Sequence, residues 1–83
     1  MSCLTEINKL EQKLEDILQG VSLGTSYAIA VYDLEELYDY ATNLKIANRR
    51  DTIFVENIEI LINKIENNLK ELSAYTNMPI EID

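Results

Sequence analysis

Apolar residues recur at alternating spacings of three and four over the last part of the chain. Because a helix turns once every 3.6 residues, positions i, i+3 and i+7 lie on one side of it. The pattern therefore predicts a helix over residues 51–75, a stretch without glycine or proline that would be about 37 Å long. Its apolar stripe consists of Val55, Ile58, Ile62, Ile65, Leu69 and Leu72.

Two earlier stretches show the same spacing and predict helices over residues 3–19 and 26–47. The first stripe consists of Cys3, Ile7, Leu10, Leu14, Ile17 and Val21. The second stripe consists of Tyr27, Ala30, Leu34, Leu37, Ala41 and Leu44. Residues 26–32 are rich in Tyr, Ile and Val, which also favour strands. We predict a helix there because the first 76 residues offer no partner strand and the stripe continues beyond residue 32.

Short polar side chains and glycine mark the ends of the predicted helices. The candidate N-caps, whose side chains can accept hydrogen bonds from the first free backbone N–H groups, are Ser2, Thr25 or Ser26, and Asp51. We expect Gly20 to end the first helix in a left-handed conformation. The third helix should end before Pro79, because a residue that precedes proline avoids the α region.

These segments predict an all-α fold, a small antiparallel three-helix bundle with a long C-terminal helix. We expect one helical domain over residues 1–77, because a chain of 83 residues is long enough for a single core. Residues 78–83 are expected to form a short extended C-terminal tail, in which Ile80 and Ile82 alternate with acidic residues.

The chain carries a formal charge of −8, from 15 acidic and 7 basic residues. Nucleic-acid backbones and anionic membranes need a basic surface, so we expect neither as a direct partner. No run approaches the roughly 18 apolar residues of a membrane span. The charge instead favours a protein partner that is itself basic.

Cysteine and histidine usage indicates the compartment. Cys3 is the single cysteine, and the chain has no histidine. Small secreted domains usually carry several disulfides, and residues 1–20 lack the apolar core of a signal peptide, so we expect a cytoplasmic protein. The abundance of isoleucine and asparagine indicates an AT-rich gene, as in low-GC bacteria and their phages and plasmids.

Some apolar residues lie outside the three stripes. On a helical wheel, four of them lie opposite the stripe of the second helix: Ile29, Tyr32, Tyr40 and Ile46. Ile53 and Ile60 lie at the back of the third helix. Single exposed apolar residues are common on any surface. Two groups of them, one rich in tyrosine, favour an interface with a partner protein or a second copy, with a homodimer the simplest assembly.

An acidic run interleaved with tyrosines lies on the second helix: Asp33, Glu35, Glu36 and Asp39 with Tyr32, Tyr38 and Tyr40. One interpretation is a solvated face that keeps the protein soluble. A second interpretation is a row of carboxylates that fits a basic groove, as in an inhibitor that mimics nucleic acid and blocks a host DNA-binding or defence protein. A third is cation binding without catalysis.

Arg49 and Arg50 precede the third helix in an otherwise acidic chain. Together with the free N–H groups of a helix start, two guanidinium groups could bind a nucleotide or a small phosphorylated ligand, with the protein acting as an oligomeric binder. The alternative interpretation is that they neutralise the end of the second helix and pair with nearby carboxylates.

Carboxylate pairs at i, i+3 occur twice, as Asp33 with Glu36 and as Glu56 with Glu59. Their spacing resembles the magnesium-holding pairs of all-α nucleotide pyrophosphohydrolases. The predicted third helix places its pair beside the core rather than in a pocket, and the sequence shows no catalytic, metal or cofactor motif. We therefore expect no enzyme, no metal and no cofactor.

The sequence favours a non-enzymatic, acidic, helical protein-interaction module: an adaptor, an assembly subunit or an inhibitor, encoded by a phage or a plasmid. The residues predicted to bind the partner are Ile29, Tyr32, Asp33, Glu36, Asp39, Tyr40, Ile53 and Ile60.

Overall fold

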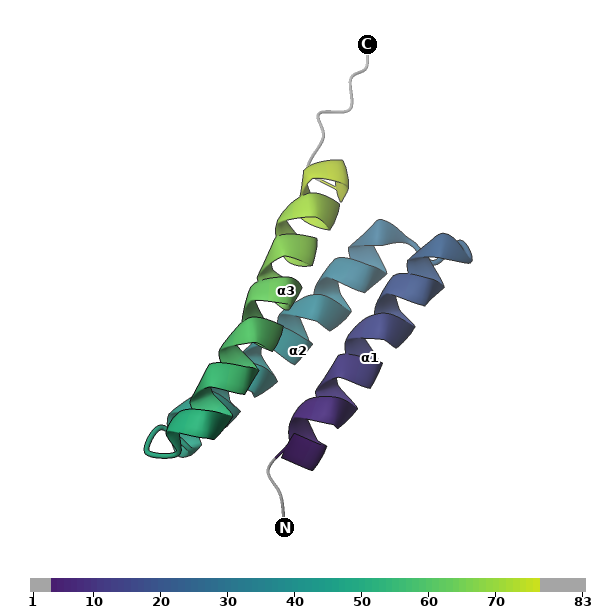
Figure 1. Cartoon of the computed structure of the whole chain (residues 1–83). Helices are drawn as coiled ribbons and strands as arrows, with labels where there is room; N and C mark the ends of the chain where they lie inside the picture. The colour runs from purple at the N-terminus through teal and green to yellow at the C-terminus, as the bar shows by residue number, and fades with distance from the viewer. Residues whose placement is uncertain (1–3, 77–83) are drawn as a thin grey trace.

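Three helices pack in an antiparallel up-down-up bundle (Figure 1). The computed structural model describes residues 4–76, with α1 over Leu4–Ser22, α2 over Tyr27–Ala47 and α3 over Thr52–Thr76. Within residues 4–76 there is no strand, so the predicted fold class is confirmed. The predictions for Ser2, Cys3, the boundary at residue 77 and the tail 78–83 lie outside the described residues.

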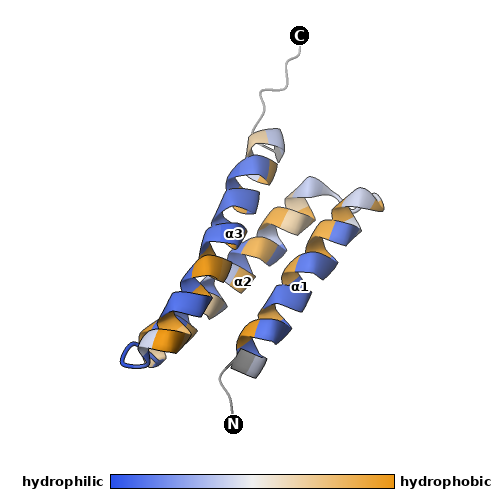
Figure 2. Cartoon of the chain, viewed as in Figure 1, coloured by the Kyte–Doolittle hydropathy of each residue, from blue (hydrophilic) through white to orange (hydrophobic). Residues whose placement is uncertain are grey.

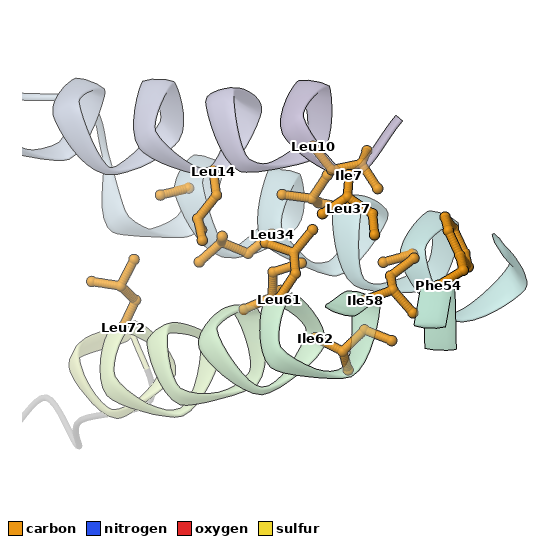
Figure 3. Close-up of a cluster of buried hydrophobic side chains, with 13 residues drawn as sticks. Ile7, Leu10, Leu14, Leu34, Leu37, Phe54, Ile58, Leu61, Ile62 and Leu72 are labelled. Atoms are coloured by element: carbon orange, nitrogen blue, oxygen red, sulfur yellow. The ribbon is translucent and has the colours of Figure 1, made fainter. Parts of the chain in front are cut away.

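The core is built from one inward side of each helix, as the stripes predict. Figure 3 shows side chains of α1 and α3 pointing toward α2, whose Leu34 lies between them. Most of the α1 and α2 stripes is confirmed, with these members buried: Ile7, Leu10, Leu14, Ala30, Leu34, Leu37 and Ala41. Ile17, Val21 and Leu44 are partly buried against the core. The prediction is wrong for Tyr27, whose side chain is 43% exposed at the start of α2. In Figure 2 hydrophobic and hydrophilic residues follow one another along α1, whereas the C-terminal half of α3 is mostly hydrophilic on the side in view.

The buried side of α3 differs from the predicted stripe. Phe54 and Leu61, which the stripe omits, are only 2% and 0% exposed. Val55 and Leu69, which the stripe includes, are half-buried. The apolar side of α3 is wider than one stripe, because apolar residues are adjacent in the sequence at several points, such as Phe54 with Val55 and Leu61 with Ile62. The position of α2 decides which edge of that side is covered.

The prediction that Gly20 ends the first helix is wrong. α1 continues through Gly20 to Ser22, where Val21 still packs against the core. Gly24 instead adopts the positive φ of 110°. The N–H of Thr25 donates to the carbonyl of Gly20 at 2.9 Å, and that of Gly24 donates to the carbonyl of Val21 at 3.0 Å. These two bonds form a Schellman motif, which satisfies the last free carbonyls of the helix.

Two of the predicted N-caps are confirmed. The Ser26 hydroxyl accepts from the N–H of Ala28 at 3.1 Å, which settles the choice between Thr25 and Ser26. Asp51 Oδ1 accepts from the N–H of Phe54 at 3.1 Å. Each cap gives a free N–H at the start of a helix its partner, and together they define the two turns that reverse the chain.

Polar and aromatic contacts at the rim of the bundle join α3 to its neighbours. Tyr75 near the end of α3 stacks on Tyr27 at the start of α2, with ring centroids 5.0 Å apart. Lys45 Nζ lies 2.8 Å from Glu59 Oε2, and this ion pair joins α2 to α3. The pair is solvent-exposed, so it contributes little free energy. The far turns of α3 thus keep contact with α2.

Candidate functional site

An open groove of about 670 Å³ lies between α1 and α2. Its lining includes the apolar residues Leu10, Ile17 and Leu37. Leu10 and Leu37 belong to the core, so the bottom of the groove is the outer edge of the core itself. The remaining lining residues are Glu6, Lys9, Lys13 and Asp16 of α1, and Asp33, Glu36 and Tyr40 of α2.

Helical periodicity explains why these polar side chains meet. On α1 they follow at spacings of three, four and three, and on α2 at three and four. Residues so spaced lie on one side of a helix. Each polar row therefore runs beside the buried stripe of its own helix. When the two stripes pack together, the two rows border the same groove, which we call the α1–α2 groove.

A hydrogen bond crosses one end of the groove. The Tyr40 hydroxyl donates to Glu6 Oε2 at 3.0 Å, which joins the late part of α2 to the start of α1. Because the carboxylate accepts from the neutral phenol and its charge opposes a phenolate, Glu6 raises the pKa of Tyr40 above its ordinary value. The bond is exposed to solvent and marks where the groove ends.

The groove continues toward the α1–α2 turn. A smaller hollow of about 260 Å³ shares Asp16, Ile17 and Asp33 with it and extends to Gly20 and Ala30. Thr25, in the turn between α1 and α2, also lines this hollow. At 1.5 Å per residue, the α1 side of the groove from Glu6 to Gly20 is about 21 Å long.

The charged residues of the groove are not paired across it. Within residues 4–76, the ion pairs shorter than 4.0 Å join Lys45 to Glu59 and Lys64 to Glu11, and none of these four residues lines the groove. Lys9 and Lys13 on α1 thus lie in the same groove as the carboxylates of α2 without a direct ion pair. Their charges remain available to a ligand.

The structure gathers only some of the predicted partner-binding residues. Asp33, Glu36 and Tyr40 line the α1–α2 groove. Tyr32 is exposed on α2 and is not part of the lining. A hydrogen bond from its hydroxyl to the Glu36 carboxylate, and the charge of that carboxylate, raise the pKa of Tyr32. The other predicted partner-binding residues of α2, Ile29 and Asp39, are exposed outside the groove. Ile46, which the helical wheel placed in the same apolar group as Ile29, is also exposed there.

The second predicted apolar group lies elsewhere on the molecule. Ile53 and Ile60 are 65% and 58% exposed and do not line the groove. Figure 2 shows hydrophobic segments among hydrophilic ones in the N-terminal half of α3. The predicted exposure of both isoleucines is confirmed, and they belong to a surface separate from that of the groove.

Arg49 and Arg50 are exposed in the turn between α2 and α3. Arg49 Nη1 donates to the carbonyl of Ile46 at 3.4 Å, a contact at the C-terminal end of α2 that the helix dipole favours. The Asp51 carboxylate already occupies the start of α3, where a bound phosphate would have to lie. The local geometry thus matches the interpretation in which arginine neutralises the end of α2.

The two carboxylate pairs do not come together. Asp33 and Glu36 line the α1–α2 groove, whereas Glu56 and Glu59 lie on α3 and are not part of its lining. Glu59 is held by Lys45. In the part of the chain that the structure describes, no three His, Cys, Asp or Glu side chains are grouped closely enough to hold a metal ion.

The sequence interpretation missed the α1 side of the groove. Its polar row is Glu6, Lys9, Lys13 and Asp16. The signal was present, because these residues repeat at the same three–four spacing as the apolar stripe beside them. A charged row of this kind is ordinary on any exposed helix, and only its position next to α2 makes it part of a site.

Comparison with protein-family models, with curated proteins and with solved structures gave no match for this chain. Among residues 4–76, none of the helices has the uninterrupted apolar stretch that a bilayer-spanning helix requires.

Proposed function

We propose that this chain is a non-enzymatic protein-interaction module that binds a partner protein with the outward side of α2. We call this side the α2 surface and define it by Ile29, Tyr32, Asp33, Glu36, Asp39 and Tyr40. The single observation that carries the proposal is the exposure of large apolar side chains there, beside several carboxylates.

The chemistry of the α2 surface suits a protein partner. Ile29, Tyr32 and Tyr40 offer apolar area, and the tyrosine hydroxyls can remain hydrated at the edge of an interface. The carboxylates would increase the rate of association and the specificity for the partner more than they would increase the affinity. Such a surface suits an adaptor, an assembly subunit or an inhibitor.

A protein partner is a better proposal than mimicry of nucleic acid. A mimic needs an unbroken row of negative charges, as a phosphate backbone has. Here Lys9 and Lys13 line the same groove as Asp33 and Glu36 and interrupt the acidic row. The mixture of charges is more suitable for a protein surface, which also carries both signs.

A pull-down from the lysate of a low-GC bacterium tests the proposal. We expect Ile29→Ser/Tyr32→Ser to lose a partner that the wild type retains. The matched control is Ile53→Ser/Ile60→Ser, which also replaces two exposed apolar residues, on α3 instead of α2. We expect this control to retain the partner, because only α2 contacts it. Mass spectrometry of the retained proteins is the measurement.

Retention of the same proteins by both variants would contradict the proposal, because a partner bound at the α2 surface must be sensitive to its apolar residues. Circular dichroism of each variant before the pull-down checks the fold. All four positions are exposed, so the substitutions should leave the helix content unchanged.

Self-association through the back of α3 is a second proposed function. The exposure of Ile53 and Ile60, seven residues apart on α3, favours it. In a two-fold symmetric dimer each isoleucine occurs twice in the interface, which doubles the apolar area removed from water. Burial of apolar area contributes about 25 cal/mol per Å² to the free energy of association. The charge of −8 on each copy opposes the contact most strongly at low salt.

Sedimentation at moderate salt measures this self-association. We expect a dimer at a concentration of about 100 μM and a monomer for Ile60→Glu, because the new carboxylate would be buried without a partner. Tyr32→Glu, on the α2 surface, should remain dimeric. A wild-type monomer at this concentration would rule out the α3 dimer, and a dimer unaffected by Ile60→Glu would assign it to another surface.

A further inference from the structure

We infer that the α1–α2 groove holds an amphipathic helix of the partner protein, with Lys or Arg along the flank that lies against α2. This inference rests on the proposed function and names the partner element that fits the site. It follows from the shape of the groove, its apolar bottom and the arrangement of its charges.

The position of the groove suits a helix. α3 packs against both α1 and α2, yet no α3 residue lines the groove. The groove is therefore the unoccupied depression of the helix pair, on the side away from α3. Helices pack with their side chains in such depressions, with axes 8–10 Å apart as a typical separation. Over a groove of about 21 Å, the occupant would be a helix of about four turns.

An extended peptide fits less well. A peptide strand binds by adding to an exposed sheet edge, where backbone groups complete its hydrogen bonds. Residues 4–76 contain no strand, and the walls of the groove are helices whose N–H and C=O groups are bonded within the helix. An incoming helix satisfies its own backbone groups and presents only side chains to the groove. Its apolar side chains would contact mainly the partly buried Ile17, because Leu10 and Leu37 are only 3% and 5% exposed.

Charge complementarity indicates that the helix bound in the groove carries positive charge. Four carboxylates and two lysines give the groove lining a formal charge of −2. On the α2 wall the charged residues are Asp33 and Glu36, while both lysines lie on the α1 wall. Basic residues on the occupant would therefore face α2. A second copy of this chain would bring the same excess of carboxylates, which disfavours it as the occupant.

Three synthetic helical peptides of about 15 residues test the inference. They share one leucine stripe, and their flanks carry Lys, Gln or Glu. Fluorescence anisotropy against the full chain should give at least about tenfold tighter binding for the Lys peptide than for the Glu peptide. The preference should shrink as salt is raised.

Two isosteric double variants locate the binding site. Asp33→Asn/Glu36→Gln removes the carboxylates of the α2 wall, and we expect about tenfold weaker binding of the Lys peptide. Glu15→Gln/Glu71→Gln removes the same charge from exposed positions outside the groove, and binding should change less than about twofold. Equal losses would show unspecific attraction and would overturn the groove assignment.

The remaining outcomes separate this inference from the proposed function. Equal affinity of the three peptides would overturn the basic flank, although the pull-down with Ile29→Ser/Tyr32→Ser could still show an α2 partner. Absence of binding by every peptide would overturn the helical occupant. Loss of the partner in that pull-down would then show that the α2 surface binds something other than a basic helix.

Discussion

Replacing Leu61 by alanine should lower the free energy of unfolding by about 2–5 kcal/mol, the usual loss for a buried leucine. Leu61 is completely buried on α3, and alanine would leave a cavity in the core of the bundle. The free energy of unfolding of an ordinary domain is only about 5–15 kcal/mol, so the variant should be close to unfolding. Urea denaturation followed by circular dichroism is the measurement.

The neighbouring residue supplies the control. Ile60 is mostly exposed in the single chain, and Ile60→Ala removes a side chain of the same size. Measured well below the concentration at which the α3 dimer is expected, this change should alter stability by no more than about 0.5 kcal/mol. Ile65→Ala, at a fully buried position that the sequence stripe also predicts, should behave like Leu61→Ala. Equal losses at positions 60 and 61 would mean that α3 buries a different side from the one described.

Replacing Gly24 by alanine should destabilise the protein by about 1–2 kcal/mol, because a side chain resists positive φ. Gly24 has a φ of 110° and forms the turn that ends α1. No atom lies within 4 Å of the position of an added Cβ, so the cost is one of backbone conformation alone. The midpoint of thermal unfolding should fall accordingly.

Gly20 is the matched control, since it lies within α1. Alanine there gains up to about 1 kcal/mol in helix propensity. Its Cβ would lie 3.1 Å from Thr25 Oγ1, which offsets part of this gain. We therefore expect Gly20→Ala to be less damaging than Gly24→Ala. The opposite order would indicate that Gly20 ends the helix, as the sequence pattern predicts.

Only the α2 side of the candidate site was predictable from the sequence. Asp33, Glu36 and Tyr40 stand out in the sequence as acidic and aromatic residues on one helix, and the structure places them in the α1–α2 groove. Lys9 and Lys13 do not stand out, because a charged row on an exposed helix is common. A groove depends on the distance and angle between two helices, and periodicity within one helix carries no information about either.

The sequence by itself determined the three helices, most of the buried stripes of α1 and α2 and the cap at Asp51, since each follows from spacing or chemistry within a few residues. For α2 it left two candidate caps, Thr25 and Ser26, and the structure shows that Ser26 is the cap. Only the tertiary structure decided three other features: the burial of Phe54 and Leu61, the extension of α1 beyond Gly20, and the groove. α3 has more apolar residues than its neighbours can cover, so the packing decides which of them are buried. α1 continues through Gly20 because the turn that follows, with Val21, still packs on the core. All three features depend on how the helices contact one another. The spacing of residues within one helix does not determine these contacts.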